Sequence, residues 1–464
     1  MKTTTKTLLL ALALMLLALP MLAEKSSPPL PGPAKPFKVP PRQQFTLPNG
    51  LVGNLVEYGS IPKVQITVAV RAGGLNEAPN QVWLSDITGQ LMREGTKSKT
   101  AEQVDAAFAR MGGELSINVT NDQTLITADV LASHAAEAAA LLAEVATEPR
   151  LPESELARLK NDQLRRLAIG KTQPGNLATE RFRKVLYGDH PYGRVFSTEE
   201  MIKGYTLADV QKFYDQNFGA QRTRVYVAGK FDPAAVKAAL TKGFSGWKQG
   251  PEPLINIPKT NAVRGFELVD RPKSVQSTLF IGLPTIDPSS PDYVPLLVTH
   301  TMLGGSFISR ITQNIRENKG YTYSPSAQLS SRYRDAYWLE RADVTTAVTG
   351  PSMKEIFAEI DGIRNASPDA AEVGRIQRYM SGVFVLQNSS RGGLINQMNF
   401  VDLHGVGDDY LRSFVQKVNA VTGADVQRMA QKYLDPGKMT IVVVGDKEKI
   451  SDQVAPYQTT AMKK

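Results

Sequence analysis

Alternating hydrophobic and polar residues mark several strands in the first half of the chain. The stretch "KVQITVAVRAGG", residues 63–74, alternates as a half-buried strand does, and "ELSINVTNDQTLITADVL", residues 114–131, gives two such runs about a polar turn. The tripeptide Pro48-Asn49-Gly50 lies between two further apolar runs, which is a hairpin signal. These patterns predict a sheet with mostly antiparallel neighbours.

Helical patterns follow these strands in runs rather than alternating with single strands. Thr100 and Gln103 have the spacing of a capping box, and glycines 112 and 113 end the helix that this box begins. An alanine-rich segment, residues 134–145, predicts another helix, closed by Pro149. Separate runs of strands and helices favour the α+β class, in which helices cover a mostly antiparallel sheet.

The second half of the chain repeats the plan of the first. "LADVQKFYDQNF" precedes "RVYVAG" in the first half, and "GADVQRMAQKYL" precedes "TIVVVG" in the second. The matching positions are Asp209 with Asp425 and Gly229 with Gly445, both 216 residues apart, and Gln65 with Gln276, 211 residues apart. The repeat predicts two homologous domains of one fold.

Two segments of distinct composition set the predicted domain limits. "GWKQGPEPLINIPKTNAVRG" is rich in proline, glycine and polar residues, as linkers are. "KSSPPLPGPAKPFKVPPRQQ" favours an extended, polyproline-like tether before the first repeat. The predicted layout is a signal peptide at 1–23, the tether at 24–43, a first domain at 44–245, the linker at 246–262 and a second domain at 263–464.

The first residues have the arrangement of a secretory signal peptide. Lys2 and Lys6 precede an apolar run at 8–19, which is followed by Pro20 and a small residue, Ala23. The run is short for a membrane span. We therefore expect an exported, periplasmic protein, with membrane association only in the alternative that the segment stays uncleaved as an anchor.

The amino-acid composition and the absence of certain motifs exclude several classes of catalytic chemistry. The chain of 464 residues has no cysteine, so it has no disulfide, no thiol nucleophile and no acylation site in the signal region. It has no GxSxG elbow, and "LGGSFISR" lacks the Lys-Ser or Lys-Thr of a phosphate loop. The net charge of +9 comes from scattered residues, which favours acidic partners over nucleic acid.

The histidines are too far apart in sequence for a helical zinc motif. A catalytic zinc usually has about three protein ligands, often including histidines four residues apart on one helix. The chain has four histidines: His134, His190, His300 and His404. We interpret His190, in the loop "YGDHPYGR", as a structural or capping residue and the other three as packed or surface residues.

One polar pair lies in "LGGSFISRITQNIRENKGYTYSPSAQ", residues 303–328. Arg316 falls at the end of a predicted helix, and Tyr323 follows beyond a break at Gly320. Both side chains are hydrogen-bond donors that could hold a peptide carbonyl or stabilise an oxyanion. The residues alone allow a second interpretation, in which Arg316 pairs with a nearby acid and Tyr323 is a half-buried strand residue.

This stretch resembles the second-domain signature of the pitrilysin and insulinase-type zinc metallopeptidases, in particular their short bacterial branch similar to mitochondrial processing peptidase. "YGDHPYGR", the "ADVQ" helix with its "VAG" strand, and "VDRPKSVQS" extend the resemblance over the mature chain. The resemblance implies two similar α+β domains that enclose a peptide.

Active members of that family carry an HxxEH zinc motif in the first domain, shortly before a Gly-Thr pair. Counting back from the Gly-Thr pair at 95–96 places the motif positions on Asp86, Gly89 and Gln90, none of which is a histidine or a glutamate. The resemblance therefore implies a degenerate motif on this helix.

The family's third zinc ligand, a glutamate, should fall in "LKNDQLRRL", where Asp162 and Gln163 stand and no glutamate does. Water becomes nucleophilic at neutral pH when a metal binds it, and no other group in this chain supplies that activation. The resemblance thus implies that the chain binds no zinc and is inactive alone, with zinc in a partner subunit.

The family's substrate-contacting arginine and tyrosine carry over onto Arg316 and Tyr323. In some short-branch members one subunit has the zinc motif and its partner supplies this pair. The implied function is a non-catalytic subunit of an exported heterodimeric zinc peptidase, with an HxxEH-containing homologous subunit as partner and a peptide or unfolded polypeptide as substrate. Two alternatives stay open: a peptide-binding scaffold without a proteolytic role, and an autonomous metalloprotease that uses Asp86 or Asp162 with distant histidines.

Overall fold

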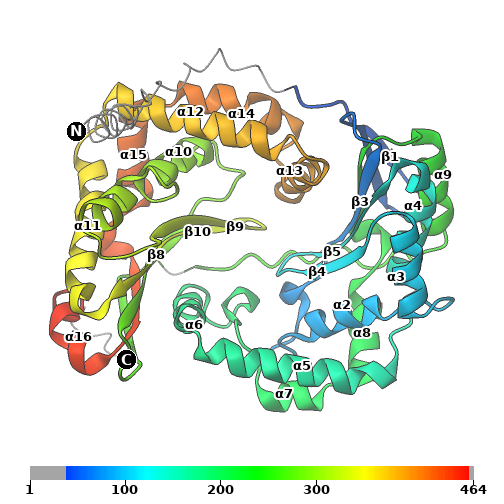
Figure 1. Cartoon of the computed structure of the whole chain (residues 1–464), viewed down its shortest axis with the longest axis horizontal. Coiled ribbons are helices and arrows are strands. Elements are labelled where there is room, and N and C mark those ends of the chain that lie inside the picture. The colour runs from blue at the N-terminus through cyan, green and yellow to red at the C-terminus, as the bar shows by residue number, and fades with distance from the viewer. Residues whose placement is uncertain (1–37, 261, 459–464) are drawn as a thin grey trace, which may run out of the picture. The chain divides into compact units, whose positions relative to one another are not determined.

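Two sheets of similar topology organise the part of the chain that the computed structural model describes, residues 38–260 and 262–458 (Figure 1). The first sheet, in the order β1-β2-β6-β3-β5-β4, contains β1 (Gln43–Thr46), β2 (Val52–Glu57), β3 (Lys63–Val70), β4 (Leu115–Val119), β5 (Thr124–Leu131) and β6 (Thr223–Gly229). The second sheet, in the order β7-β11-β8-β10-β9, contains β7 (Gly265–Asp270), β8 (Gln276–Thr285), β9 (Ser326–Arg332), β10 (Asp335–Thr345) and β11 (Thr440–Gly445).

Helices accompany each sheet. The first half contains α2 (Leu84–Arg93), α3 (Ala101–Arg110), α4 (Ala135–Thr147), α5 (Glu153–Thr172), α6 (Pro174–Tyr187), α7 (Glu199–Gly204), α8 (Leu207–Asn217) and α9 (Pro233–Phe244). The second half contains α10 (Tyr293–Leu303), α11 (Thr349–Asn365), α12 (Ala370–Gln387), α13 (Arg391–His404), α14 (Asp408–Ala420), α15 (Gly423–Tyr433) and α16 (Lys447–Val454). The predicted α+β class with two similar halves is confirmed.

The predicted signal peptide and most of the predicted tether lie outside the described residues. Within the described part, no helix is long and apolar enough to cross a membrane. The limits given above for the two domains stay a prediction, although no helix or strand is present in the described residues between α9 and β7.

Strand pairing confirms the repeat. β6 runs parallel to β2 and antiparallel to β3, and β11 stands in the same relation to β7 and β8. The helix before each of these central strands, α8 or α15, begins with a capping box at Thr206 or Thr422. The two threonines are 216 residues apart, which is the predicted offset.

The register corrects the second predicted offset. Gln65 pairs with Ala228 in the first sheet, and Thr278 pairs with Val444 in the second. Because Ala228 and Val444 are 216 residues apart, Gln65 is equivalent to Thr278 and not to Gln276. The sequence alignment was wrong by two residues, a slip that keeps the same face of the strand and so leaves the hydrophobic pattern unchanged.

Two local predictions are confirmed in detail. β1 and β2 form an antiparallel hairpin, and the turn places Gly50 at φ 91°, in the left-handed region that favours glycine. In α3 the Thr100 side chain accepts a hydrogen bond from the Gln103 main-chain N–H, while the Gln103 side chain accepts one from the Thr100 N–H. Both features depend on residues close together in sequence.

The two halves exchange helices. α6, from the first half, packs on β8 and β11 of the second sheet, and α13, from the second half, packs on β3 and β6 of the first (Figure 1). Phe182 of α6 lies in one core cluster with Phe280 and Tyr337, and Met398 of α13 lies in another with Tyr226. Each half therefore has part of its apolar area buried by a helix of the other half.

A buried polar network accompanies α6 where it meets the second sheet. Arg332 donates from Nη1 to the Tyr187 hydroxyl at 2.8 Å, and that hydroxyl donates to Asp335 Oδ2 at 2.6 Å. The Arg332 guanidinium lies 5.0 Å from the ring centre of Tyr192, whose hydroxyl donates to Asp122. Burial raises the pKa of Asp335, and the bonds from Tyr187 and the charge of Arg332 oppose that shift. This network ties first-half side chains to β9 and β10.

Two buried histidines predict a loss of stability in acid. Burial lowers the pKa of His300 and of His404 to about 4, from an ordinary value of 6.5. The unfolded chain therefore binds more protons than the folded chain between about pH 6.5 and pH 4, so stability falls as the pH falls through this range. At pH 5 each histidine lowers the free energy of unfolding by about 2 kcal/mol relative to pH 7.

Urea unfolding at pH 7 and pH 5 measures this effect. We expect His404→Gln to show a smaller difference between the two pH values than the unmodified chain. The His134→Gln variant is the control, because the His134 side chain is only partly covered, pairing with Glu137 at 2.9 Å on the surface. An equal pH difference in all three proteins would contradict the assignment.

Candidate functional site

The helix that should carry a zinc motif, α2, instead carries an ion pair. Asp86 Oδ1 accepts from Arg166 Nη1 of α5 at 3.0 Å, and the Arg166 guanidinium lies 4.7 Å from the ring centre of Trp83. Burial raises the pKa of Asp86, while the charge and hydrogen bond of Arg166 oppose that rise. Asp86 therefore has a cationic partner already in place.

The other two motif positions pack against the sheet. A Cβ at Gly89 would stand 2.6 Å from Val119 Cγ2 of β4, so only glycine fits between this helix and this strand without movement. Gln90 has a buried side-chain oxygen, Oε1, that accepts no hydrogen bond from the described residues. These two positions hold the helix close to the sheet. The only side-chain oxygen that they could offer to a metal is the neutral amide oxygen of Gln90.

The segment expected to hold the third ligand, residues 159–167, belongs to α5, which packs against α2. Within it, Asp162 forms ion pairs with Arg158 and Arg165 on the outer surface. Gln163 is buried beside Arg166, with 3.5 Å between Gln163 Oε1 and Arg166 Nη1. Of the residues in this segment, Arg166 is the one that forms an ion pair with Asp86, and Gln163 lies next to it.

A buried acid fixes the start of α2. Glu77 accepts hydrogen bonds from the main-chain N–H groups of Trp83 and Ser85 and from the Ser85 hydroxyl, at 3.1, 2.9 and 2.6 Å. Burial raises the pKa of Glu77 to about 7, against these bonds. Three donors from one turn give Glu77 a structural role at the N-terminus of the helix.

These residues do not fit a zinc ion. The one carboxylate is paired with an arginine, the second position has no side chain, and the third is an amide. Within residues 38–260 and 262–458, no group of three or more His, Asp or Glu side chains could hold a metal. Zinc needs about three protein ligands, so we derive no step of chemistry through a metal in this chain.

Restoring the motif on α2 alone should therefore fail. We expect the triple variant Asp86→His, Gly89→Glu, Gln90→His to bind far less than one zinc per chain. Arg166 would stand where the third ligand is needed, and the new side chain at 89 would press on Val119. The zinc content of the dialysed variant, measured by plasma mass spectrometry, tests this expectation.

The matched comparison adds Arg166→Glu and Val119→Ala to the triple variant. This set supplies the third ligand and the missing space, and we expect it to take up more zinc. If the triple variant alone binds one zinc per chain, the geometric account of α2 and α5 is wrong.

The Arg316 guanidinium lies over two aromatic rings. Arg316 lies in a π-helical segment, Thr312–Asn318, a rare conformation that is frequent at functional sites. Its guanidinium lies 4.4 Å from the ring centre of Phe307 and 5.3 Å from that of Tyr323. Nη1 also donates to the adjacent Glu317 at 2.7 Å, as the second sequence interpretation expected, so both rings and an acid position this cation.

Tyr323 lies at the surface, outside any strand. The residue is 82% exposed, which corrects the alternative of a half-buried strand residue. Its neighbour Thr322 donates from Oγ1 to the Asp343 carbonyl at 2.7 Å and forms an isolated bridge with Val344. The tyrosine ring therefore projects from a loop that is anchored to the end of β10.

The pair borders a cavity of about 460 Å³. Its wall also contains the glycines of "LGGS", the segment after Tyr323, and two aromatic residues that the sequence did not single out, Phe307 and Tyr379. Phe307 is 63% exposed and Tyr379 40% exposed. An exposed aromatic residue in a single sequence has no periodicity to mark it, so only the fold shows that Phe307 contacts Arg316 and that Tyr379 lines the same cavity.

The histidines take structural positions. His190 accepts at Nδ1 from the Tyr192 N–H at 3.2 Å and caps a short helical turn, so the capping interpretation is confirmed. His300 and His404 are buried on α10 and α13, and His134 precedes α4 and pairs with Glu137. All four are accounted for by packing, capping or a surface pair.

Duplicated helix-covered sheets, a helix in the position of a zinc motif and the arginine-tyrosine cavity define a metallopeptidase-type fold. Comparison of the sequence with known families agrees. Residues 55–198 match the family described as "Insulinase (Peptidase family M16)", and residues 204–380 match "Peptidase M16 inactive domain". The chain belongs to the M16 peptidase family.

Relatives extend over most of the chain. The "Uncharacterized zinc protease YmxG" of Bacillus subtilis is 23% identical over 393 residues, covering 84% of this chain and 95% of that protein. An "Uncharacterized zinc protease" of Streptomyces coelicolor is 23% identical over 425 residues, covering 89% of this chain and 92% of that protein.

Solved structures show the same fold. A structure titled "peptidase M16 inactive domain" from Pseudomonas fluorescens has a TM-score of 0.81 at 22% identity, covering 91% of this chain and 100% of that chain. A protease from Helicobacter pylori has a TM-score of 0.80 at 19% identity, covering 88% of this chain and 100% of that chain.

Proposed function

We propose that this chain is the non-catalytic subunit of an exported, heterodimeric zinc peptidase. It contributes Arg316 and Tyr323 to a site whose zinc is bound by an HxxEH-containing homologous subunit, and the substrate is a peptide or an unfolded polypeptide. The observation that carries the proposal is the contrast between the two candidate sites. Asp86 is paired with Arg166, whereas Arg316 and Tyr323 meet at an open cavity.

The geometry of the pair suits a developing negative charge on a peptide carbonyl oxygen. A guanidinium and a phenol hydroxyl are both donors, and donors fixed in advance stabilise such a charge better than water does. The contacts of Arg316 with the rings of Phe307 and Tyr323 and with Glu317 provide that fixation. Names of the relatives as zinc proteases support the peptidase part of the proposal for the family.

Reconstitution tests the proposal. The mature chain and an HxxEH-containing homologous subunit are purified separately, and cleavage of an unstructured peptide is measured with each alone and with both. We expect cleavage to rise strongly only when both are present. Unchanged partner activity on mixing would favour the scaffold alternative, and cleavage by this chain alone would favour an autonomous protease.

A further inference from the structure

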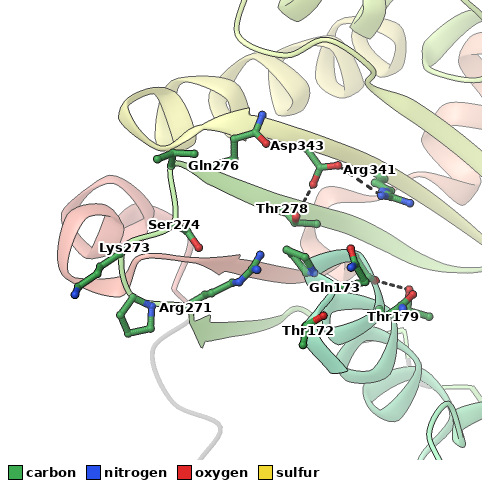
Figure 2. Close-up of a pocket in the computed structure, with 15 residues that line it drawn as sticks. Thr172, Gln173, Thr179, Arg271, Lys273, Ser274, Gln276, Thr278, Arg341 and Asp343 are labelled. Atoms are coloured by element: carbon green, nitrogen blue, oxygen red, sulfur yellow. Dashed lines mark hydrogen bonds and ion pairs between the residues drawn. The ribbon is translucent and has the colours of Figure 1, made fainter. Parts of the chain in front are cut away.

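A second cavity, of about 740 Å³, lies where α6 meets the start of the second sheet (Figure 2). Its walls come from the end of α5 and the beginning of α6, from the loop between β7 and β8, and from β8 and β10. The polar residues that line it are Thr172, Gln173, Asn176, Thr179, Arg271, Lys273, Ser274, Gln276, Thr278, Arg341 and Asp343.

The charge of this lining is positive. Three cations, Arg271, Lys273 and Arg341, line the cavity with a single carboxylate, Asp343. That carboxylate already accepts from the Thr278 hydroxyl and lies 3.5 Å from Arg341 Nη2. Among the described residues, neither Arg271 nor Lys273 has a side-chain ion pair. Two cations are therefore without a counter-charge.

The side chains present donors from opposite walls. In Figure 2 Arg271 extends from its loop toward Gln173, whereas Lys273 points away from it at the outer rim. Arg341 lies over the first turn of α6, where a Cβ at Gly175 would stand 3.1 Å from Arg341 Nη2. Glycine at 175 thus leaves room for that guanidinium. The β8 residues of the same lining are Gln276 and Thr278.

This basic cavity is connected to the Arg316–Tyr323 site through one strand end. Arg341 and Asp343 belong to β10, and the Asp343 carbonyl accepts the hydrogen bond from Thr322, the residue before Tyr323. Ser326, in the wall of the Arg316 cavity, pairs with Arg341 across β9 and β10. The two cavities are therefore linked through the last residues of β10.

We propose that the basic cavity binds a carboxylate of the substrate peptide, either its C-terminal carboxylate or an acidic side chain. Guanidinium groups bind carboxylates with paired, charge-assisted hydrogen bonds. This inference rests on the proposed peptide-binding function and narrows it to acidic peptides or acidic peptide ends.

Fluorescence anisotropy with the full mature chain tests the inference. Three labelled, unstructured peptides are compared at low salt: one ending in two glutamates with a free C-terminus, one with glutamines in place of the glutamates, and one with the glutamates and a C-terminal amide. We expect the first peptide to bind about tenfold more tightly than the peptide that lacks the recognised carboxylate. This factor is the effect on affinity of losing about one charge-assisted hydrogen bond. The peptide that loses affinity identifies which carboxylate is bound.

A matched pair of variants locates the effect. Arg271→Ser with Lys273→Ser removes the unpaired cations and should abolish the discrimination between the peptides. Arg375→Ser with Lys417→Ser, which removes the same charge from exposed positions on α12 and α14, should preserve it. Equal affinity of the unmodified chain for all three peptides, or equal loss in both variants, would overturn the inference.

Arg316→Ala with Tyr323→Phe separates this inference from the proposed function. If the basic cavity binds no carboxylate but the proposed function is correct, these substitutions lower the affinity for all three peptides equally, and the unmodified chain does not distinguish the peptides by charge. If the proposed function is incorrect but the basic cavity binds a carboxylate, these substitutions leave the peptide affinities unchanged, and the difference in affinity that depends on Arg271 and Lys273 persists. Failure of every peptide to bind overturns the inference, whereas the proposed function is decided by cleavage in the reconstituted pair.

Discussion

Replacing Arg316 with alanine lowers the kcat/KM of the reconstituted two-subunit enzyme by about 100-fold, the usual effect of removing one fixed donor to a developing oxyanion. The guanidinium contacts the rings of Phe307 and Tyr323, so alanine removes both the donor and the cation–π contact with the tyrosine ring. Tyr323→Phe removes one hydroxyl and keeps the ring, and we expect a smaller loss of about tenfold.

Steady-state cleavage of a peptide, together with the affinity of the two subunits, measures the effect. Arg375→Ala is the matched control, because this arginine is exposed on α12 and lies outside the Arg316 cavity. The control should keep full activity, and Arg316→Ala should still bind the partner subunit. Full activity of Arg316→Ala would remove the reason for assigning the pair to the site and would favour the scaffold alternative.

Replacing Phe182 with alanine destabilises the second sheet although Phe182 belongs to the first half. The ring is 1% exposed, with its centre 6.3 Å from that of Phe280 and 5.4 Å from that of Tyr337. Removing a buried phenylalanine costs about 3–5 kcal/mol, and the loss falls on the cluster shared with β8, β10 and β11.

Hydrogen exchange of individual segments distinguishes this effect from general destabilisation. Phe182→Ala should increase exchange in β8 and β11. Phe108→Ala, in the core of the first half, serves as the control and should act first on α3 and the first sheet. If Phe182→Ala increases exchange only in the first half, α6 does not support the second sheet as described.

Local sequence predicted the features that neighbouring residues determine. The hairpin at Gly50 and the capping box at Thr100 both depend on residues within a few positions, so their spacing is informative. The repeat was visible for the same reason, because each half carries the same helix motif and central strand in the same order.

Features that depend on contacts distant in sequence were not predictable in this way. α6 and α13 each pack on the sheet of the other half. An amphipathic pattern predicts that a helix has a buried face but does not indicate which sheet that face packs against. Arg166 rather than Asp162 meets Asp86, because the rotation of α5 on α2 decides which residue faces inward. The sequence did not indicate that Phe307 and Tyr379 line the Arg316 cavity, because the fold brings them there.

The most direct test of the account is the zinc content of the purified mature chain after incubation with zinc and dialysis. The pairing of Asp86 with Arg166 and the packing of Gly89 on Val119 predict far less than one zinc per chain, while the HxxEH-containing partner treated in the same way retains one. One tightly bound zinc per copy of this chain would contradict the account.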